Sequence, residues 1–575
     1  MVTLTIDGIK VEVPEGTTVL EASKKVQVRI PTLCHYEGTE NWGGCRLCIV
    51  EVEGWNKTPA SCVLPVQEGM VVKTNSQKLL TARKEILKLI LAAHPADCKT
   101  CEKHGRCELQ TLSYEFDIHD FGYPMREKRH YRDDTSPAIT RDYDKCILCG
   151  RCVRVCRDWQ SVATYDFANR GSQMVVTPPF NKNMIDTNCV ACGQCAIACP
   201  TGSISETDTI EKVQELMASG KHMVVQVAPS IRVSLGELFG MPPGTIVTGK
   251  IVTALKRLGF HAVFDTNFGA DMTIMEEAAE LVKAIKENKT HLTSSCCPAW
   301  INFIEEFYPD LIPQLSTTKS PHEILGVLAK SYYAEKMNLK PADIVVVSIM
   351  PCTAKKWESH RPELTTEGVP SVDETLTTRE LGRMIREAGL QFADLPDTEF
   401  DTPLGISTGA AAVFGTTGGV TEAALRTASE LYTGKPLQNV EFTGVRGFGN
   451  LRTTTVELDG KTIKVAVTHT LGAARKLLED LRCGKQDFNF IEVMACPGGC
   501  VGGGGQPIPP REHREETIKK RAQALYQVDK SLPYRKSHEN PAVKKVYEEF
   551  LGAPLSEKAR KYLHTSYKAR KGYGV

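Results

Sequence analysis

The chain has almost no excess of charge of either sign: 70 Lys and Arg stand against 69 Asp and Glu, and the formal net charge is +1. The strongly basic face of a typical nucleic-acid-binding protein is therefore not indicated. No apolar run approaches the roughly 18–20 residues that a membrane-spanning helix needs. Residues 1–8 show neither the charged nor the apolar segment of a secretion signal. We expect a soluble, cytoplasmic protein with no membrane span and no nucleic-acid partner.

The cysteines are the unusual feature of an otherwise ordinary composition. Hydrophobic residues make up 41% and charged residues 24% of the 575 residues, which excludes a disordered or fibrous chain and suggests about three to five domains. Of 21 cysteines, 15 precede residue 200 and none lies between residues 200 and 295. Because disulfides are rare in a reducing cytosol, clustered cysteines in a long chain indicate metal ligands or catalytic thiols.

Residues 1–78 read as a strand-rich domain with one set of four cysteines. Apolar and polar residues alternate on either side of Asp7-Gly8, which predicts a β-hairpin. The spacing C-x10-C-x2-C-x13-C is typical of four thiolates around a [2Fe–2S] cluster, although zinc would also accept them. The strand-rich frame and the long first spacing favour the cluster. The four cysteines are Cys34, Cys45, Cys48 and Cys62.

Residues 79–140 begin within a helical pattern and continue into a set of one histidine and three cysteines. His94 stands four residues before Cys98, and Cys101 and Cys107 complete the run. Such a set suits a [4Fe–4S] cluster with one imidazole ligand, and it suits zinc equally well. The residues alone leave both interpretations open.

Residues 141–207 carry the run C-x2-C-x2-C-x3-C twice, which is typical of bacterial ferredoxins with two [4Fe–4S] clusters. In that arrangement the fourth cysteine of each run binds the cluster of the other run. We therefore expect one cluster on Cys146, Cys149, Cys152 and Cys199. The second cluster is expected on Cys189, Cys192, Cys195 and Cys156.

Residues 208–575 alternate short apolar runs with amphipathic helical patterns, which predicts α/β architecture with parallel sheets covered on both faces. Expected strands span 223–227, 262–265, 344–349, 463–467 and 490–493, and expected helices include 272–286, 420–431 and 473–481. Functional groups in such folds follow the carboxyl ends of strands. Cys352 and Cys496 follow two of the expected strands directly.

Three motifs in this region carry a specific resemblance. They begin at Ser294 (SSCCPAW), Met350 (MPCTAKK) and Glu492 (EVMACPGGC, continuing VGGGGQP). In this order they resemble the signatures of [FeFe]-hydrogenases. The upstream modules resemble those of the large clostridial-type form, in which a one-His/three-Cys [4Fe–4S] domain follows the [2Fe–2S] domain. The resemblance covers the whole chain.

The resemblance implies four units and a set of cofactors. It implies a β-grasp ferredoxin-like domain (1–78), a one-His/three-Cys domain (79–140), a 2[4Fe–4S] ferredoxin domain (141–207) and a two-lobed α/β catalytic domain (208–575). It also implies one [2Fe–2S] cluster, three accessory [4Fe–4S] clusters and an H-cluster, which joins a [4Fe–4S] cluster to a diiron group with CO, cyanide and azadithiolate ligands. The H-cluster ligands that it implies are Cys297, Cys352, Cys496 and Cys500.

The resemblance further implies roles around the H-cluster in the reaction 2H⁺ + 2e⁻ ⇌ H2. Lys355 and the loop Ala228-Pro229-Ser230 would hold the cyanide ligands, and Met350, Met494 and Phe414 would form an apolar wall. Protons would pass through Cys296, a water, Glu277, Ser316 and Glu280. Glu277 and Glu280 are three residues apart on an expected helix, so they share one face. His322 and Pro497 depart from the pattern, and Cys483 remains as a small apolar residue expected in a helix.

Two other functions fit these residues less well than catalysis does. An iron–sulfur carrier or cluster-assembly protein would not need Cys296 or Lys355, and both are present. A hydrogen sensor would be expected to lack the thiol and to carry signalling domains. The expected electron partner is ferredoxin, or NAD(P)-linked flavoprotein subunits, because no dinucleotide-binding fingerprint is evident here. Diiron maturation proteins are expected as further partners.

Overall fold

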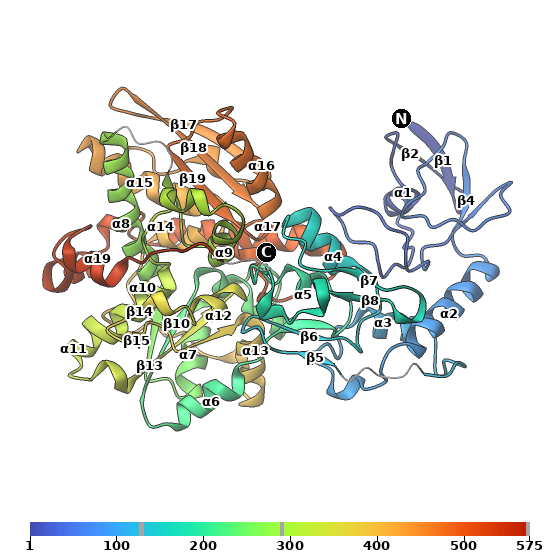
Figure 1. Cartoon of the computed structure of the whole chain (residues 1–575), viewed down its shortest axis with the longest axis horizontal. Coiled ribbons are helices and arrows are strands. Elements are labelled where there is room, and N and C mark those ends of the chain that lie inside the picture. Colours follow the sequence, from blue (N-terminus) through green and yellow to red (C-terminus); the bar gives the residue numbers. More distant parts are fainter. Residues whose placement is uncertain (126–130, 288–291, 571–575) are drawn as a thin grey trace.

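The computed structural model describes residues 1–125, 131–287 and 292–570. The segments before residue 208 lie on one side of the molecule, and the remainder forms a larger body on the other side (Figure 1). The chain's N-terminus lies at the top of the first domain in this view (Figure 1). No helix in the described part of the chain is long and apolar enough to cross a lipid bilayer.

The N-terminal domain is a mixed four-stranded sheet with one helix, in the order β2-β1-β4-β3. Strand β1 pairs antiparallel with β2 and parallel with β4. Asp7 and Gly8 both have positive φ, so the predicted hairpin turn is confirmed. Its elements are β1 (Val2–Ile6), β2 (Ile9–Val13), α1 (Val19–Lys25), β3 (Glu51–Val52) and β4 (Val71–Lys73).

The next two units are small and are built largely from loops. The first has α2 (Gln77–Ala92) and α3 (Glu108–Glu115). The second has the antiparallel sheet β5-β6-β9 and two short helices, each of which contains the third cysteine of a run. Its elements are β5 (Arg132–Asp133), β6 (Ile139–Asp142), α4 (Arg151–Arg154), β7 (Asp166–Ala168), β8 (Val175–Thr177), α5 (Gln194–Ala198) and β9 (Ile204–Glu206).

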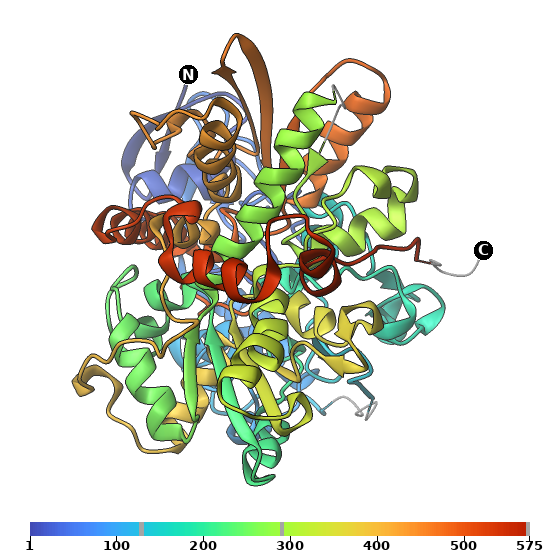
Figure 2. The same cartoon turned by 90° about the vertical axis from the view of Figure 1, so that its left-hand side faces the viewer.

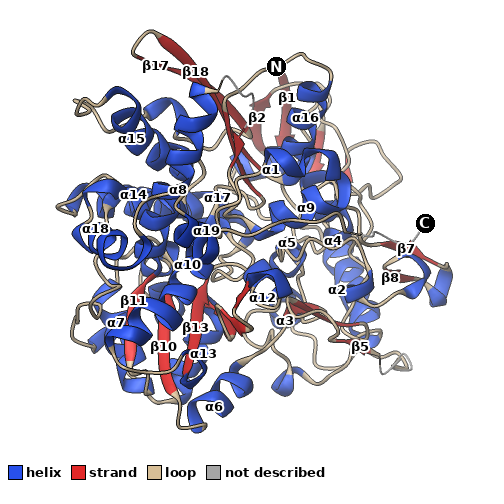
Figure 3. Cartoon of the chain, turned by 60° about the vertical axis from the view of Figure 1, so that its left-hand side comes forward, coloured by secondary structure: helices blue, strands red, loops and turns tan. Residues whose placement is uncertain are grey.

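The larger body contains two four-stranded sheets, of which the first is wholly parallel, in the order β11-β10-β13-β16. Helices cover both of its faces, as the buried runs predicted (Figure 3). Its strands are β10 (His222–Val227), β11 (Ala262–Asp265), β13 (Ile344–Met350) and β16 (Glu374–Thr377). Its helices are α6 (Ile210–Ala218), α7 (Thr248–Leu258) and α13 (Thr378–Glu387) on one face, with α8 (Thr266–Lys286) and α10 (Pro321–Leu328) on the other.

The second sheet, in the order β12-β19-β18-β17, corrects the expectation of parallel sheets only. Strands β12, β19 and β18 run parallel, whereas β17 pairs antiparallel with β18 in a long hairpin. The hairpin turns at Asp459-Gly460, where both residues have positive φ. Its elements are β12 (Leu292–Thr293), β17 (Leu451–Leu458), β18 (Lys461–His469) and β19 (Phe490–Met494), with α9 (Pro298–Phe307), α15 (Gly419–Thr433) and α16 (Leu471–Arg482).

The C-terminal helices lie across the middle of the larger body, between its upper and lower parts (Figure 2). Helix α17 (Arg514–Ser531) packs Ile518 and Leu525 against Val233 and Val501, which belong to loops of the two sheets. Downstream, α18 (Pro541–Val546) and α19 (Glu557–Leu563) pack on the first sheet's helices. The C-terminal region therefore supports both halves of the body.

One buried ion pair fixes α17 to α15. Both nitrogens Nη1 and Nη2 of Arg426 donate to Asp529 at 2.9 Å, and neither side chain is exposed to solvent. Burial alone would raise the pKa of Asp529, but hydrogen bonds from Arg426 and Arg535 lower it below its usual value. The stabilisation from this carboxylate is therefore fully present above a pH of about 4 and is lost as pH falls through the lowered pKa.

Replacing Asp529 with asparagine should destabilise the body by about 3–5 kcal/mol, because it removes the carboxylate that Arg426 and Arg535 share and leaves only Glu422 to pair with the buried Arg426 guanidinium. The midpoint of denaturant unfolding measures the change. The matched control is Asp459→Asn, which breaks a pair with Lys435 whose side chains are 73% and 46% exposed, and which should cost less than about 1 kcal/mol. Equal midpoint shifts in the two variants would contradict the argument.

Candidate functional site

A cavity lies between the two sheets, where loops from both converge. Strand β10 leads into Ala228-Pro229-Ser230. Strand β13 ends at Met350 and leads into Cys352, and β19 ends at Met494 and leads into Cys496. Its volume is about 80 Å³, which exceeds the roughly 10–15 Å³ that one water requires. The expectation that functional groups follow the carboxyl ends of these strands therefore holds for the chain's largest thiol cluster.

Five cysteine thiols line this cavity, and none is in a disulfide. They are Cys296, Cys297, Cys352, Cys496 and Cys500. Burial and the neighbouring thiol Cys297 raise the pKa of Cys352 to about 12, and burial raises the pKa of the other four thiols as well. Crowded, buried thiols of this kind need a cationic metal centre to hold them as thiolates. The donor set therefore fits an iron–sulfur centre.

Lys355 brings a positive charge to the cavity wall. Its ammonium donates to Glu358 Oε2 at 2.5 Å and to the carbonyl of Cys296 at 3.3 Å. The carboxylate of Glu358 also accepts from Ser320 Oγ at 3.0 Å. Glu358 was not predicted as a site residue, yet it fixes where the Lys355 charge stands.

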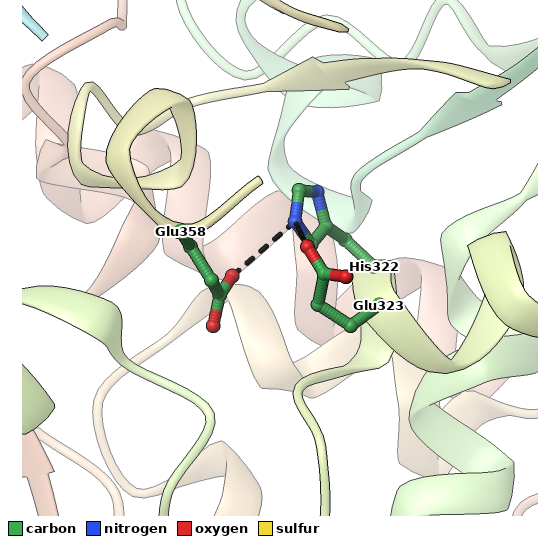
Figure 4. Close-up of side chains that lie close together, drawn as sticks. All are labelled: His322, Glu323 and Glu358. Carbon is green, nitrogen blue, oxygen red and sulfur yellow. Dashed lines mark hydrogen bonds and ion pairs between the residues drawn. The ribbon is translucent and has the colours of Figure 1, made fainter. Parts of the chain in front are cut away.

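His322 lines the cavity beside Lys355 and lies within a small cluster of carboxylates (Figure 4). Its Nε2 is 2.6 Å from Glu323 Oε1 and 3.3 Å from Glu358 Oε2. Burial, with the nearby Lys355 charge, lowers the pKa of His322 to about 3, so the ring is neutral. The ammonium of Lys355 already occupies Glu358 Oε2, which makes this cluster a hydrogen-bond network rather than a cation site.

Ser230 is oriented from behind the cavity by Gln506. The amide of Gln506 donates to Ser230 Oγ at 3.1 Å and to the carbonyl of Cys500 at 3.3 Å. Its oxygen accepts from Ser234 Oγ at 2.7 Å and Thr378 Oγ1 at 2.9 Å, so the amide cannot rotate freely. Because Ser230 Oγ accepts from Gln506, its own proton remains available toward the cavity.

The predicted proton-carrying residues lie on one side of the cavity, on α8 and its neighbours. Glu277 is fully buried, and the backbone N–H of Ser295 donates to its Oε1 at 3.4 Å. Burial, reinforced by the nearby Glu280, raises the pKa of Glu277 to about 8. Ser316 Oγ donates to Glu280 Oε2 at 2.6 Å, and the Glu280 side chain is 15% exposed. These residues therefore form a sequence of groups from buried to partly exposed.

The outer end of this sequence contains a residue that the sequence analysis missed. His564 comes from the C-terminal region, and its Nδ1 lies 2.8 Å from Thr317 Oγ1 and 3.6 Å from Glu280 Oε1. Backbone pairing between Thr318 and His564 holds it there. No spacing rule could have found a partner so far beyond Glu280 in the chain; only the observation that the C-terminal segment pairs here reveals it.

The cysteines before residue 200 gather into four further sets. Cys48 Sγ lies 3.4 Å from Cys62 Sγ, and the N–H of Cys45 donates to Cys34 Sγ at 3.4 Å. One small cavity is lined by Cys146, Cys149, Cys152 and Cys199, and another by Cys156, Cys189, Cys192 and Cys195. Each cavity therefore combines three cysteines of one run with the fourth of the other.

His94 has the form expected of a metal ligand. Its Nδ1 lies 2.9 Å from the carbonyl of Pro95, and its Nε2 is buried without a hydrogen-bond partner in the described part of the chain. A donated Nδ1 proton leaves the Nε2 lone pair free, which is how ligating histidines are oriented. Cys98, Cys101 and Cys107 are close enough to influence one another's charge.

The second ferredoxin cavity abuts the central one. Thr353, which follows Cys352, donates from Oγ1 to the carbonyl of Ala191 at 2.7 Å. Gln194 donates to the carbonyl of Gly502 at 3.0 Å. A Cβ on Gly193 would lie 2.4 Å from Thr353 Oγ1, so only glycine permits this approach. Cys483, which was expected in a helix, is the residue that directly follows α16, and it is exposed.

Comparison with known proteins identifies the family. Residues 221–504 match the C-terminal domain of the iron only hydrogenase large subunit, and residues 515–570 match the iron hydrogenase small subunit. Residues 1–77, 83–121 and 145–203 match a 2Fe-2S iron-sulfur cluster binding domain, the NADH-ubiquinone oxidoreductase-G iron-sulfur binding region and a 4Fe-4S dicluster domain, respectively.

Two full-length relatives and one solved structure agree with these matches. The chain is 48% identical to the NADP-reducing hydrogenase subunit HndD of Solidesulfovibrio fructosivorans, over 99% of each chain. It is 40% identical to iron hydrogenase 1 of Clostridium pasteurianum, over 99% of this chain and 100% of that one. A variant of the [FeFe]-hydrogenase HydA1 from Chlamydomonas reinhardtii is 40% identical, with a TM-score of 0.56, and covers 62% of this chain and 98% of its own. The chain therefore belongs to the iron-only, or [FeFe]-, hydrogenases and is an oxidoreductase with 2Fe-2S and 4Fe-4S clusters and an H-cluster.

Proposed function

We propose that the chain interconverts protons and H2 at an H-cluster held in the central cavity by Cys297, Cys352, Cys496 and Cys500. The observation that carries this proposal is the lining of the cavity, which gathers these four thiols with Cys296 and Lys355. The H-cluster would supply the redox chemistry of H2. The remaining steps belong to the protein: it must hold the group, exclude water and move protons.

The cavity walls are suited to holding a group that has few bonds to the protein. The fixed ammonium of Lys355 and the hydroxyl of Ser230 can donate to cyanide ligands from opposite loops. Met350, Met494 and Phe414 line the rest of the wall with apolar surface. Because water is excluded, each fixed charge and dipole acts more strongly on the bound group than it would in solvent.

Protons would move through Cys296, Glu277, Ser316 and Glu280, with one water bridging Cys296 and Glu277. Each of these groups can both donate and accept a proton, and Glu277 is poised near neutrality because its pKa is raised to about 8. Glu280 stands at the exposed end of the series. The hydrogen bond from Ser316 to Glu280 supports this order.

Electrons would reach the cavity through one [2Fe–2S] and three [4Fe–4S] accessory clusters. The proposed ligands are the cysteine sets described above, with His94 in the set of Cys98, Cys101 and Cys107. An NAD(P)-linked partner is favoured over ferredoxin, because the relative at 48% identity is an NADP-reducing hydrogenase subunit and spans the same length. Diiron maturation proteins would be needed to insert the diiron group into the cavity. We expect the protein to act in the cytoplasm.

Infrared spectra of anaerobically loaded protein test the proposal most directly. Bands in the CO and cyanide stretching window that shift between argon and H2 are expected, because both ligand types report electron density at the diiron group. Loading the purified chain with a synthetic diiron cofactor provides the control for incomplete maturation. If no such bands appeared after the protein had been treated with the synthetic cofactor, the proposed function of the cavity would be overturned.

Replacing His94 with cysteine should retain the cluster of the one-His/three-Cys unit and lower its midpoint potential. A thiolate adds a negative charge where the imidazole was neutral, and this disfavours the reduced state. Redox titration followed by EPR spectroscopy measures the shift. His119, an exposed histidine of the same domain that lies outside the cysteine run, provides the control: His119→Cys should leave the potential unchanged. An unaltered potential in His94→Cys would exclude His94 as a ligand.

A further inference from the structure

Arg154, at the end of α4, reaches from the ferredoxin unit into the N-terminal domain. Its Nη2 donates to the carbonyl of Cys34 in the first domain and to that of Cys149 in its own unit at 3.3 Å. Its Nη1 donates to the carbonyl of Glu40 at 2.8 Å, and its Nε to that of Gly150 at 3.2 Å. One guanidinium group therefore joins the backbone of two cysteines that belong to different cluster sites.

The charge of Arg154 has no carboxylate partner among the described residues. All four of its hydrogen bonds go to backbone carbonyls, although the residue is only 5% exposed. The two other arginines of this helical segment differ, because Arg151 pairs with Glu108 and Arg157 pairs with Glu40 and Asp158. A buried cation normally stands next to a counter-charge. Here the nearest groups that can carry negative charge are the thiols of Cys34 and Cys149, with a weaker contribution from Asp158, to which Arg154 makes no ion pair.

Trp42 holds the guanidinium in this place. The carbon Cζ of Arg154 lies 5.6 Å from the centre of the Trp42 ring, within range of a cation–π interaction. The ring packs against Phe167 of the ferredoxin unit, with centroids 4.6 Å apart. A Cβ on Gly150 would lie 2.6 Å from the Trp42 ring, so this residue must be glycine for the indole to fit. The two domains therefore interlock at this point.

We propose that Arg154 is a positioning residue that couples the Cys34 cluster to the Cys149 cluster, fixing the gap between them and favouring the reduced state of both. The proposal rests on the cluster ligands assigned under the proposed function. Its Nη2 donates to the backbone on either side of the gap, which sets the separation across which an electron passes. Its positive charge offsets the negative charge that each cluster gains on reduction, and a cation close to both stabilises both reduced forms.

Redox titration of the loaded, full-length protein followed by EPR spectroscopy tests the proposal through potentials rather than turnover. Arg154→Gln should shift the midpoint potentials of both the [2Fe–2S] cluster and its neighbouring [4Fe–4S] cluster to more negative values. Arg157→Gln removes the same charge from the same helical segment, but from an exposed side chain that is already paired, and should shift neither. An unchanged potential at either cluster in Arg154→Gln, or equal shifts in both variants, would overturn it.

A second variant keeps the test decisive if Arg154→Gln loses a cluster. Arg154→Lys retains the charge but ends in a single nitrogen, so it loses the bonds of Nη1 to Glu40 and of Nε to Gly150 that hold Nη2 between the two cysteine carbonyls. It should keep both potentials near those of the wild type and weaken the magnetic interaction between the two reduced clusters. Full retention of that interaction would contradict the positioning role. Absence of both EPR signals in the wild type would instead refute the assigned ligands.

Discussion

Replacing Cys296 with serine should leave the H-cluster in place and remove most of the turnover, by about 10²–10⁴-fold. The thiol lines the cavity, and the adjacent Lys355 ammonium contacts only its backbone carbonyl, so a serine leaves the wall intact. A hydroxyl is far less acidic than a thiol, so a serine beside the bound group would release its own proton less readily than Cys296 does. Proton transfer at the cavity should therefore become limiting while binding of the group is preserved.

The measurement is H2 evolution per loaded cofactor, with infrared spectra that report loading. Cys483→Ser is the matched control, because this cysteine is exposed at the end of α16 and remote from the cavity. It should show wild-type turnover and wild-type bands. If Cys296→Ser retained normal turnover, the thiol could not be the first proton carrier.

Glu277→Gln should have an effect of similar size, about 10²–10⁴-fold, since an amide fills the same space but cannot carry a proton. The wild-type pH profile supplies a second expectation. Because burial raises the pKa of Glu277 to about 8, the side chain is mainly the acid at neutral pH and becomes the carboxylate above that value. H2 evolution should therefore fall as pH rises through about 8, and the residual activity of the variant should lack that fall.

Asp271→Asn is the control for this experiment. It changes another buried carboxyl on α8, whose hydrogen-bond partners, Thr408 and Asn540, stand outside the proposed series. Turnover per loaded enzyme should be close to that of the wild type. A Glu277→Gln variant with near-normal H2 evolution and an unchanged pH profile would mean that protons leave by another route.

The cysteine sets were predictable from the sequence because cluster ligands obey short, local spacings. The runs around Cys146 and Cys189 specify their own loops, and the crossed pairing follows from the repeat. The ends of β13 and β19 were also predictable, since buried apolar runs mark parallel strands. The antiparallel strand β17 was missed because its residues alternate between exposed and partly buried positions; the Asp459-Gly460 turn that follows it was the available signal.

Residues that act through distant contacts could not be found in this way. Gln506 orients Ser230 across 276 positions of sequence, and His564 reaches Thr317 across 247. Glu358 lies near Lys355 in sequence, but the position of its carboxylate depends on contacts with Ser320 and His322, which the sequence does not show. Such partners are set by tertiary packing, which leaves no periodic trace along the chain.

The position of α17 has a consequence for how the protein is made. Residues 221–504 leave the ribosome before α17 does. Until α17 follows, the loops around Val233 and Val501 are not covered by the apolar side chains of Ile518 and Leu525. Gly415 closely contacts Leu525 as well, since a Cβ there would lie 2.4 Å from its Cδ1. The nascent catalytic region thus exposes these loops until the segment that follows it emerges and docks. If residues 515–570 and the preceding chain were synthesised separately, the preceding chain would be in the same state: its cavity loops would lack the apolar contacts of α17 until the second polypeptide docked.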